Sequence, residues 1–464
     1  MKRKIFQNFS SADKQAWEDQ AKKDLKGGDF EKQLVSTAAE GFAVYPYYAA
    51  EDTVDTQWIK AYDNRINPVS DIPGGSARHW VNAVEVVAKD EAALNQEIRL
   101  VLENGADGLI LSLSKDLDLD KVFNGVLLPY ISIWIKPTGE IIPIVEAFAD
   151  WLGRKHFDIT DLKGGIIWDG LRQGFDQSIQ IEEQIDRIAF IHQLFASYPQ
   201  FKSICLDSSV YPNAGSTAVQ ELGYALAALV ELWDGLTERG IKPEVLFSDL
   251  FVLTAVGSDY FMEIAKLKTF RITLHQLAKL YEVDLLAEEI YIFASTSRWS
   301  KSIDEPYNNL LRNTTEAMSA VIGGCNALFV APHDQNLDTP AVFSKRMARN
   351  ISTILKEESY FDKAVDPAAG SYLIENLIHS LYEESLTLLK NVESEGGWWK
   401  LYLNHQIQKE VKVMRNTKFQ QLIQGEIKKV GIAEHTPDDT FTHFPEEDYQ
   451  LRSCHHFLPY EQIL

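Results

Sequence analysis

Short apolar runs alternate with amphipathic stretches along most of this chain, and that alternation restricts its fold more than any other feature. The runs are typical of β-strands because they are short and bounded by polar or glycine-containing segments. The expected strands are Val81–Val87, Gly108–Ser114, Tyr130–Ile135, Gly164–Trp168, Ser203–Ser208, Val245–Leu253, Glu289–Ala294 and Asn326–Ala331. The stretches between them predict helices, among them Ala214–Arg239, Ser258–Tyr281 and Tyr307–Val321.

Strands separated by helices pair in parallel through crossover connections, and eight such units close a (β/α)8 barrel. An open doubly wound sheet is the alternative, but no G-x-G-x-x-G follows the first strand run. We therefore predict an α/β fold, a (β/α)8 TIM barrel spanning residues 80–397.

The stretch from Thr339 to Trp398 predicts a helix, a compact turn and a second helix. Thr339 and Pro340 suit the start of the first helix, and Asp366-Pro367 ends it. Gly370 permits a tight turn, after which Ser371 can cap the second helix. Apolar residues at helical spacing are expected to face the core: Phe343, Met347, Ile351 and Ile354 in the first helix, and Leu373, Leu377 and Leu381 in the second.

The residue identities of this stretch carry more information than its spacing. It contains the pattern ARN…L..ES…V.DPAAGSY..E.L…VE..GG, which resembles a signature of the methylmalonyl-CoA mutase family. In that family the signature lies at the end of a substrate-binding barrel, so the resemblance implies the same fold. The family has catalytic and non-catalytic members, and the remaining motifs indicate which kind this chain resembles.

Residues 1–79 differ from the barrel region and are expected to form an N-terminal arm. A short amphipathic helix around Ala12–Leu25 precedes an extended stretch, Phe42–Asp52, in which Tyr45, Tyr47 and Tyr48 crowd together without a helix or strand period. Such a stretch is expected to lie along another surface, either its own barrel or a partner subunit. The phrase EGF.V.P.Y also resembles the arm that wraps the partner in heterodimeric family members.

Residues 398–464 are expected to form a C-terminal helical linker, Lys400–Gly425, and a polar tail. Family members that carry cobalamin in the same chain have a further domain with a D-x-H-x-x-G motif, and that motif is absent from this sequence. The resemblance therefore implies no cofactor in this chain, with adenosylcobalamin held by the partner subunit.

Catalytic relatives line the barrel axis with small or polar side chains, because the CoA ester passes through it. A Ser-Gly-Tyr-His stretch ends their fifth strand, but alignment on Ala214-Gly215 places Ser209 at the Tyr and Val210 at the His. Valine cannot donate a hydrogen bond to a thioester carbonyl.

The other strands show the same kind of replacement. In the run related to Arg-Thr-His-Ser-Gln-Thr-Ser, Phe293 and Ser295 replace His and Gln, and Phe329-Val330-Ala331 replaces a His-Thr-Asn run. Trp134 stands where the third strand of relatives has Ser, and Ile167 replaces a Gln on the fourth. The stretch Ser76–Val81 does not supply the family's Tyr/Arg-Gln-Tyr run. We therefore expect bulky side chains to block the axis, and we assign no catalytic, cofactor-binding or metal-binding residues.

Composition excludes several other classes. The formal net charge of −22 argues against nucleic acid or an anionic membrane as a partner. Three widely spaced cysteines and the lack of a secretory signal or a long apolar run indicate a cytoplasmic protein. The cluster Cys454-His455-His456 near His443 lacks a second ligand pair at metal spacing, so we interpret it as part of a polar tail.

These patterns favour the small, non-catalytic subunit of a heterodimeric methylmalonyl-CoA mutase, whose catalytic large subunit would interconvert succinyl-CoA and methylmalonyl-CoA in propionate metabolism. One alternative is an active substrate-binding subunit of a split acyl-CoA mutase. The other is a non-enzymatic binding or regulatory barrel.

Overall fold

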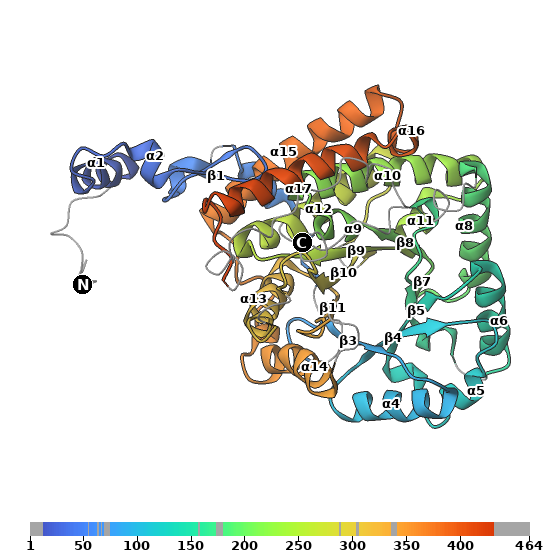
Figure 1. Cartoon of the computed structure of the whole chain (residues 1–464). Coiled ribbons are helices and arrows are strands. Elements are labelled where there is room, and N and C mark those ends of the chain that lie inside the picture. The colour runs from blue at the N-terminus through green and yellow to red at the C-terminus, as the bar shows by residue number, and fades with distance from the viewer. Residues whose placement is uncertain are drawn as a thin grey trace, which may run out of the picture.

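A ring of parallel strands surrounded by helices forms the body of the protein (Figure 1). The computed structural model describes residues 13–53, 55–62, 65, 67–68, 75–155, 158–172, 180–286, 289–302, 306–335 and 341–430. The nine strands of the sheet are β3 Val81–Val86, β4 Gly108–Leu113, β5 Ser132–Pro137, β6 Lys163–Ile166, β7 Phe201–Lys202, β8 Ile204–Asp207, β9 Leu250–Val256, β10 Tyr291–Thr296 and β11 Ala327–Phe329. Their order, β7-β6-β5-β4-β3-β11-β10-β9-β8, follows the chain around the ring.

The strands β7 and β8 are two halves of one barrel strand, interrupted at Ser203. β7 pairs with β6 and β8 pairs with β9, so together they close the ring. At the interruption, the Asp249 side chain takes the place of a strand partner. Its carboxylate accepts hydrogen bonds from the Ser203 backbone N–H at 2.7 Å and from the Ser203 hydroxyl. The same carboxylate lies 2.7 Å from His192 Nδ1. The TIM-barrel fold is therefore confirmed, and each of the eight expected strand runs contains a barrel strand, although some limits differ.

The helices of the barrel cover the outside of the strands. They are α4 Glu91–Glu103, α5 Leu119–Val122, α6 Ile141–Gly153, α8 Ile181–Phe195, α9 Val210–Asn213, α10 Ala218–Glu238, α11 Pro243–Asp249, α12 Tyr260–Leu280, α13 Asn308–Gly323, α14 Val342–Glu357 and α15 Tyr372–Ser394. Short 3-10 turns are η1 Ala50–Thr53, η2 Gln57–Tyr62, η3 Leu128–Tyr130, η4 Ile159–Asp161 and η6 Phe361–Lys363. None of the helices in the described part of the chain has the length and apolar character needed to cross a membrane.

Capping residues explain several helix limits. The Thr217 hydroxyl accepts the Gln220 N–H at 3.1 Å while the Gln220 side chain accepts the Thr217 N–H, which forms a capping box at the start of α10. Ser371 caps α15 as expected, and Gly324, with a φ of 103°, ends α13 before β11.

Two expectations about local structure are wrong. Residues 245–249 form part of helix α11 and not the start of a strand, because Pro243 at the first helical turn favours a helix that buries Leu246 and Phe247. Tyr130 likewise ends a 3-10 turn, and β5 begins only at Ser132.

The buried face of α14 also differs from the expected one. Phe343 and Ile354 are exposed and Met347 is half-buried, whereas the residues that face the core are Ser344, Ala348, Ile351, Ser352 and Leu355. Small residues let this helix approach β3 closely, so that the Ser352 hydroxyl accepts the indole N–H of Trp80 at 3.0 Å. The larger side chains of Phe343, Met347 and Ile354 consequently lie on a face of the helix that is not fully buried. Thr339 and Pro340 lie outside the described residues.

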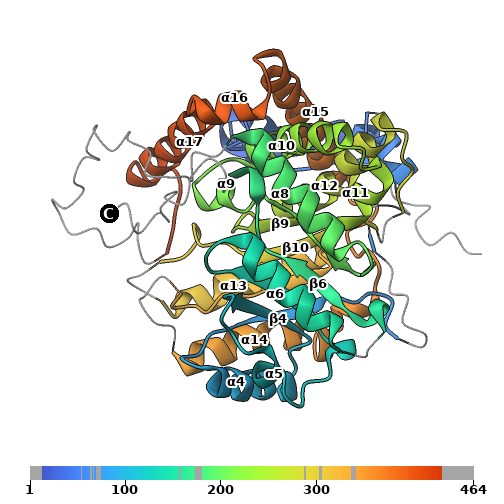
Figure 2. The ribbon, with the colours of Figure 1, turned by 90° about the vertical axis from the view of Figure 1, so that its right-hand side faces the viewer.

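The C-terminal helices α16 Trp398–Leu403 and α17 Gln406–Ile423 cross the barrel near α10 and α15 (Figure 2). The Trp398 indole stacks on Tyr402 with ring centroids 4.3 Å apart and donates to the Tyr211 hydroxyl at 3.0 Å. Ile407 and Val411 are fully buried in the same core. These helices are thus part of the packed body of the protein.

The described part of the N-terminal arm projects from the barrel (Figure 1). It contains α1 Lys14–Asp24, α2 Phe30–Leu34 and a hairpin of β1 Ser36–Thr37 with β2 Ala43–Val44. Its base is anchored, because Phe42 and Val44 pack against the core and Glu40 accepts the Ala218 N–H at 3.0 Å.

Candidate functional site

The inside of the barrel is filled by a cluster of mainly bulky side chains. We define the interior cluster as Ala83, Ile110, Trp134, Cys205, Phe251, Phe293 and Ala327, which come from β3, β4, β5, β8, β9, β10 and β11. Each of these residues is at most 5% exposed. The outward-facing residues of the same strands belong to two other clusters, which pack against the helices.

Trp134 lies at the centre of the interior cluster and is fully buried. Its ring centroid is 4.8 Å from that of Phe251, 4.8 Å from that of Phe293 and 5.4 Å from that of Tyr291. Two strands, β9 and β10, therefore contribute three rings around the indole. Tilted contacts at such distances are favourable for aromatic pairs.

A glycine on the neighbouring strand β6 lies beside the indole. Gly165 pairs in register with Trp134, and a Cβ at position 165 would lie 3.0 Å from the indole and 2.4 Å from the Lys202 carbonyl oxygen. The preceding Gly164 has a φ of 120°, and a Cβ there would lie 2.0 Å from the Ile133 carbonyl oxygen. Gly165 thus makes room for Trp134 inside the ring, whereas Gly164 lets β6 approach the backbone of β5.

The bulky residues that we expected to face the barrel axis do lie inside the barrel. Trp134 and Phe293 belong to the interior cluster, and Ile167 and Phe329 are partly buried against it. Ser295 shares this face, since it pairs in register with Phe329, and its hydroxyl donates to the Thr254 carbonyl at 3.3 Å.

The residues at the His and Tyr positions of catalytic relatives lie outside the interior cluster. Val210 begins the short helix α9 and packs against the outer core. The Ser209 hydroxyl donates to the Asp207 carboxylate. Neither residue contributes a side chain to the centre of the barrel.

Sequence reasoning missed a group of charged residues at the carboxyl end of β6 and β8. Arg172 donates to Asp207 at 2.8 Å, and the Asp169 carboxylate accepts the backbone N–H of Arg172 at 3.1 Å and of Asp207 at 3.3 Å. Burial raises the pKa of Asp169 to about 6, although Arg172 opposes the shift. Carboxyl ends of barrel strands are the usual position of functional groups, and the acid-then-base spacing of Asp169 and Arg172 after an apolar run was the available signal.

A second charged pair lies at the same end of the barrel. Lys136 at the end of β5 donates to Glu85 of β3 at 3.3 Å, and both side chains are at least one-third exposed. These polar groups therefore surround the carboxyl end of an apolar, aromatic interior.

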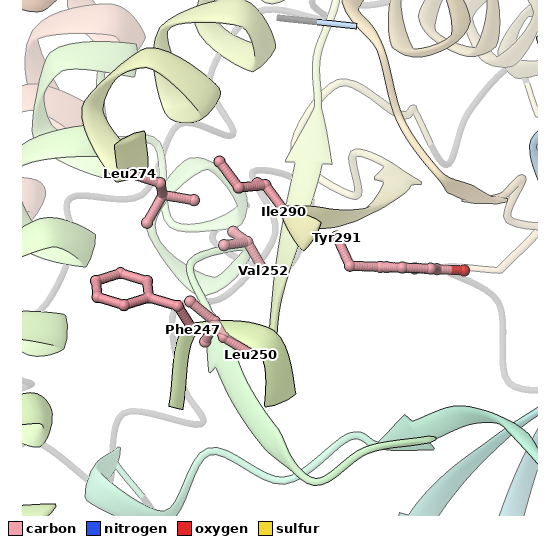
Figure 3. A pocket seen from close by; sticks show the side chains of 6 residues that line it. All are labelled: Phe247, Leu250, Val252, Leu274, Ile290 and Tyr291. Carbon is pink, nitrogen blue, oxygen red and sulfur yellow. The ribbon is translucent and has the colours of Figure 1, made fainter. Parts of the chain in front are cut away.

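A narrow apolar pocket lies near the amino ends of β9 and β10. It is lined by Phe247, Leu250, Val252, Leu274, Ile290 and Tyr291 and is too narrow to hold a water molecule. In Figure 3 the Tyr291 ring points away from the Phe247 and Leu274 side chains, on the other side of the strand. Its lining has no cationic or anionic side chain, so it does not resemble a site for an acyl-CoA.

Within the described ranges, no group of three or more His, Cys, Asp or Glu residues is arranged to bind a metal ion. The tail residues Cys454, His455 and His456 lie outside those ranges.

Comparisons with known proteins agree with this barrel. The family model described as methylmalonyl-CoA mutase matches residues 78–455. A methylmalonyl-CoA mutase small subunit from Porphyromonas gingivalis is 32% identical over 88% of this chain and 67% of its own length. A small subunit from Streptomyces virginiae is 28% identical over 81% of this chain and 61% of its own length.

A mitochondrial methylmalonyl-CoA mutase from Bos taurus is 28% identical over 82% of this chain and 55% of its own length. The chain thus spans between 55 and 67% of the length of these three relatives. Given a family match across most of its sequence, this chain belongs to the methylmalonyl-CoA mutase family.

Proposed function

We propose that this chain is the small, non-catalytic subunit of a heterodimeric methylmalonyl-CoA mutase. Its partner would be a large subunit that binds adenosylcobalamin and interconverts succinyl-CoA and methylmalonyl-CoA. The observation that carries the proposal is the aromatic interior: the rings of Trp134, Phe251 and Phe293 occupy the middle of the barrel.

The residues inside the barrel do not fit a CoA ester. A pantetheine arm needs continuous space along the axis, whereas Trp134 contacts aromatic rings from β9 and β10, and its indole would lie only 3.0 Å from a Cβ at position 165. Opening such a path would require removing several buried rings from a close-packed interior. Accordingly, we assign no step of the mutase reaction to this chain.

The chemistry of the axis supports the same proposal. A catalytic site for acyl migration needs hydrogen-bond donors toward the thioester carbonyl. Phe293 and Phe329 face the interior without a donor, and Val210 packs elsewhere. The active split-mutase alternative needs such donors at these positions.

The projecting arm supports an assembly role. Helix α1 buries none of its residues, yet Trp17 stacks on Tyr47 with centroids 4.9 Å apart. Tyr45 and Tyr47 are 41% and 39% exposed. Aromatic side chains with exposed edges are enriched at protein interfaces, so the arm suits contact with a partner subunit. The small-subunit names of two relatives are consistent with a heterodimer.

Reconstitution tests the proposal. The full chain would be co-expressed with a large subunit from the same genome, and the purified complex assayed for mutase activity and cobalamin content. We expect one cobalamin per heterodimer, activity in the complex, and no binding of succinyl-CoA by the isolated chain in calorimetry.

Two other outcomes would favour the alternatives. Stoichiometric acyl-CoA binding by the isolated chain would support the split-mutase function. A chain that forms no complex with a large subunit would instead point to a separate binding or regulatory barrel.

A further inference from the structure

The turn of the β1–β2 hairpin carries a carboxylate that reaches the barrel. Glu40 lies in this turn, which the Gly41 N–H closes by donating to the Ala38 carbonyl oxygen at 2.9 Å. Gly41 has a φ of 96°, a left-handed conformation that favours glycine. The Glu40 carboxylate accepts the Ala218 N–H at 3.0 Å, so the turn joins the arm to the first residue of α10.

This contact places a negative charge at the positive end of a long helix. The helix α10 runs for 21 residues, and the Ala218 N–H is one of the donors at its start for which the helix itself has no acceptor. The capping box uses the N–H groups of Thr217 and Gln220 instead. Glu40 therefore adds a further cap to α10, supplied by the arm.

A cation of α17 lies close to the same carboxylate. Lys418 donates to the Ser216 carbonyl oxygen at 2.7 Å, two residues before Ala218. Burial lowers the pKa of Lys418, and among the carboxylates that oppose this shift Glu40 has the largest effect. We define the arm anchor as Glu40, Ala218 and Lys418, which bring together the arm, α10 and α17.

The outer part of the arm is held by contacts within the arm. None of the residues of α1 is buried, and Figure 1 shows α1 and α2 away from the helices of the barrel. The Trp17 ring stacks on Tyr47, and its centroid lies 6.3 Å from that of Phe30. Lys14 pairs with Asp52 in η1, which contacts α15. The outer elements thus form one unit, whose direction is set at its base.

We propose that Glu40 is a positioning residue that fixes the direction of the arm relative to the barrel. Phe42 and Val44 bury apolar surface at the base of the arm, but such contacts are not directional. The hydrogen bond from the Ala218 N–H is directional, and Lys418 attracts the same carboxylate. The arm anchor therefore holds the hairpin turn at one place on the barrel.

A fixed arm favours assembly, because it loses less freedom of motion when a partner subunit binds. This consequence rests on the proposed function. The position of the arm does not, since every residue of the arm anchor belongs to this chain.

Double electron–electron resonance on the isolated full chain tests the position of the arm. Spin-labelled unnatural amino acids replace Lys23 on α1 and Leu280 on α12, both of which are exposed. We expect a broader distance distribution in Glu40→Ala than in the wild type. Glu40→Gln keeps an acceptor for the Ala218 N–H and should recover part of the narrow distribution. An equal width in the wild type and Glu40→Ala would overturn the proposal.

Thr217→Ala is the matched control, because it removes another cap of α10 that comes from the barrel. It should lower the urea midpoint and leave the distance distribution unchanged. A distribution that broadens equally in Thr217→Ala and Glu40→Ala would also overturn the proposal, since Glu40 would then act only through the stability of α10.

Calorimetric titration with the large subunit tests the consequence for assembly. We expect Glu40→Ala to raise the Kd about three- to tenfold, whereas Glu103→Ala, which removes an exposed carboxylate of the barrel, should leave it unchanged. A broadened distance distribution with an unchanged Kd would overturn the consequence for assembly. A wild-type chain that forms no complex would contradict the proposed function, and the distance measurement would still decide the role of Glu40.

Discussion

The ring centroids of Trp134 and Phe293 lie 4.8 Å apart inside the barrel, although the two residues come from strands on different sides of β3, β4 and β11. Contacts of this kind cross the barrel and tie distant strands together. The side chains that make these contacts occupy the space that a ligand passing along the axis would need.

Trp134→Ala should destabilise the protein by about 3–5 kcal/mol, because it removes a fully buried ring from a close-packed interior. Urea denaturation followed by circular dichroism measures the change. Trp134→Phe is the matched control: it keeps an aromatic ring and removes an indole N–H that has no hydrogen-bond partner, so we expect a much smaller loss. Equal losses in both variants would show that ring packing is not the cause.

Trp17→Ala combined with Tyr47→Ala should weaken the complex with the large subunit by about tenfold or more, because the pair forms a partly exposed aromatic surface on the arm. Barrel stability should not change, since α1 buries none of its residues. Calorimetric titration of the large subunit measures the affinity. Tyr130→Ala, which removes a 78% exposed ring on the barrel, is the control. Unchanged affinity of the double variant would remove these rings from the interface.

A larger truncation tests the whole extended arm. Deleting residues 1–52 should leave a folded barrel, because every barrel strand begins at or after Val81, but should weaken co-elution with the large subunit. Loss of the circular dichroism signal would show instead that the base of the arm, where Phe42 and Val44 contact the core, is needed for folding.

Asp169 should give the protein a pH-dependent stability. Burial raises its folded-state pKa to about 6, above the ordinary value of 3.8, so between these values the folded state binds the proton more tightly than the unfolded state does. Stability is therefore expected to decrease as the pH rises from about 4 to 6 and to stay level above that range. Asp169→Asn should remove this pH dependence. The measurement is the difference between the urea midpoints of the wild type and of Asp169→Asn at each pH from 4 to 8. Parallel curves for the two proteins would contradict the assignment.

Asp249→Ala should destabilise the protein by about 2–4 kcal/mol, because Ser203 and His192 lose their buried acceptor at the break between β7 and β8. Asp284→Ala removes an exposed carboxylate paired with Arg65 and should cost less than about 1 kcal/mol. Equal effects in the two variants would mean that Asp249 does not hold the barrel strand together.

The fold could be predicted from sequence because parallel barrel strands are buried on both faces and leave continuous apolar runs. The interior positions of Trp134 and Phe293 followed from the family pattern, since a barrel strand fixes which residues point inward. By contrast, Phe251 and Tyr291 went unnoticed as partners of Trp134, because contacts across a barrel have no signal in local spacing.

Helix faces and charged groups were less predictable. The orientation of α14 depended on small residues such as Ser344 and Ala348, which carry little hydrophobic signal but permit close packing. The contacts among Asp169, Arg172 and Asp207 join two residues that follow β6 to one at the end of β8, so their proximity required the three-dimensional ring.

The fit between Gly165 and Trp134 also limits how this barrel can evolve. A side chain at position 165 would clash with the Lys202 carbonyl oxygen and press on the indole, while loss of the indole leaves a void that a glycine cannot fill. Each single change is therefore expected to lower a stability that in most proteins totals only about 5–15 kcal/mol. Opening the axis would need several simultaneous substitutions on neighbouring strands, each of which alone lowers stability.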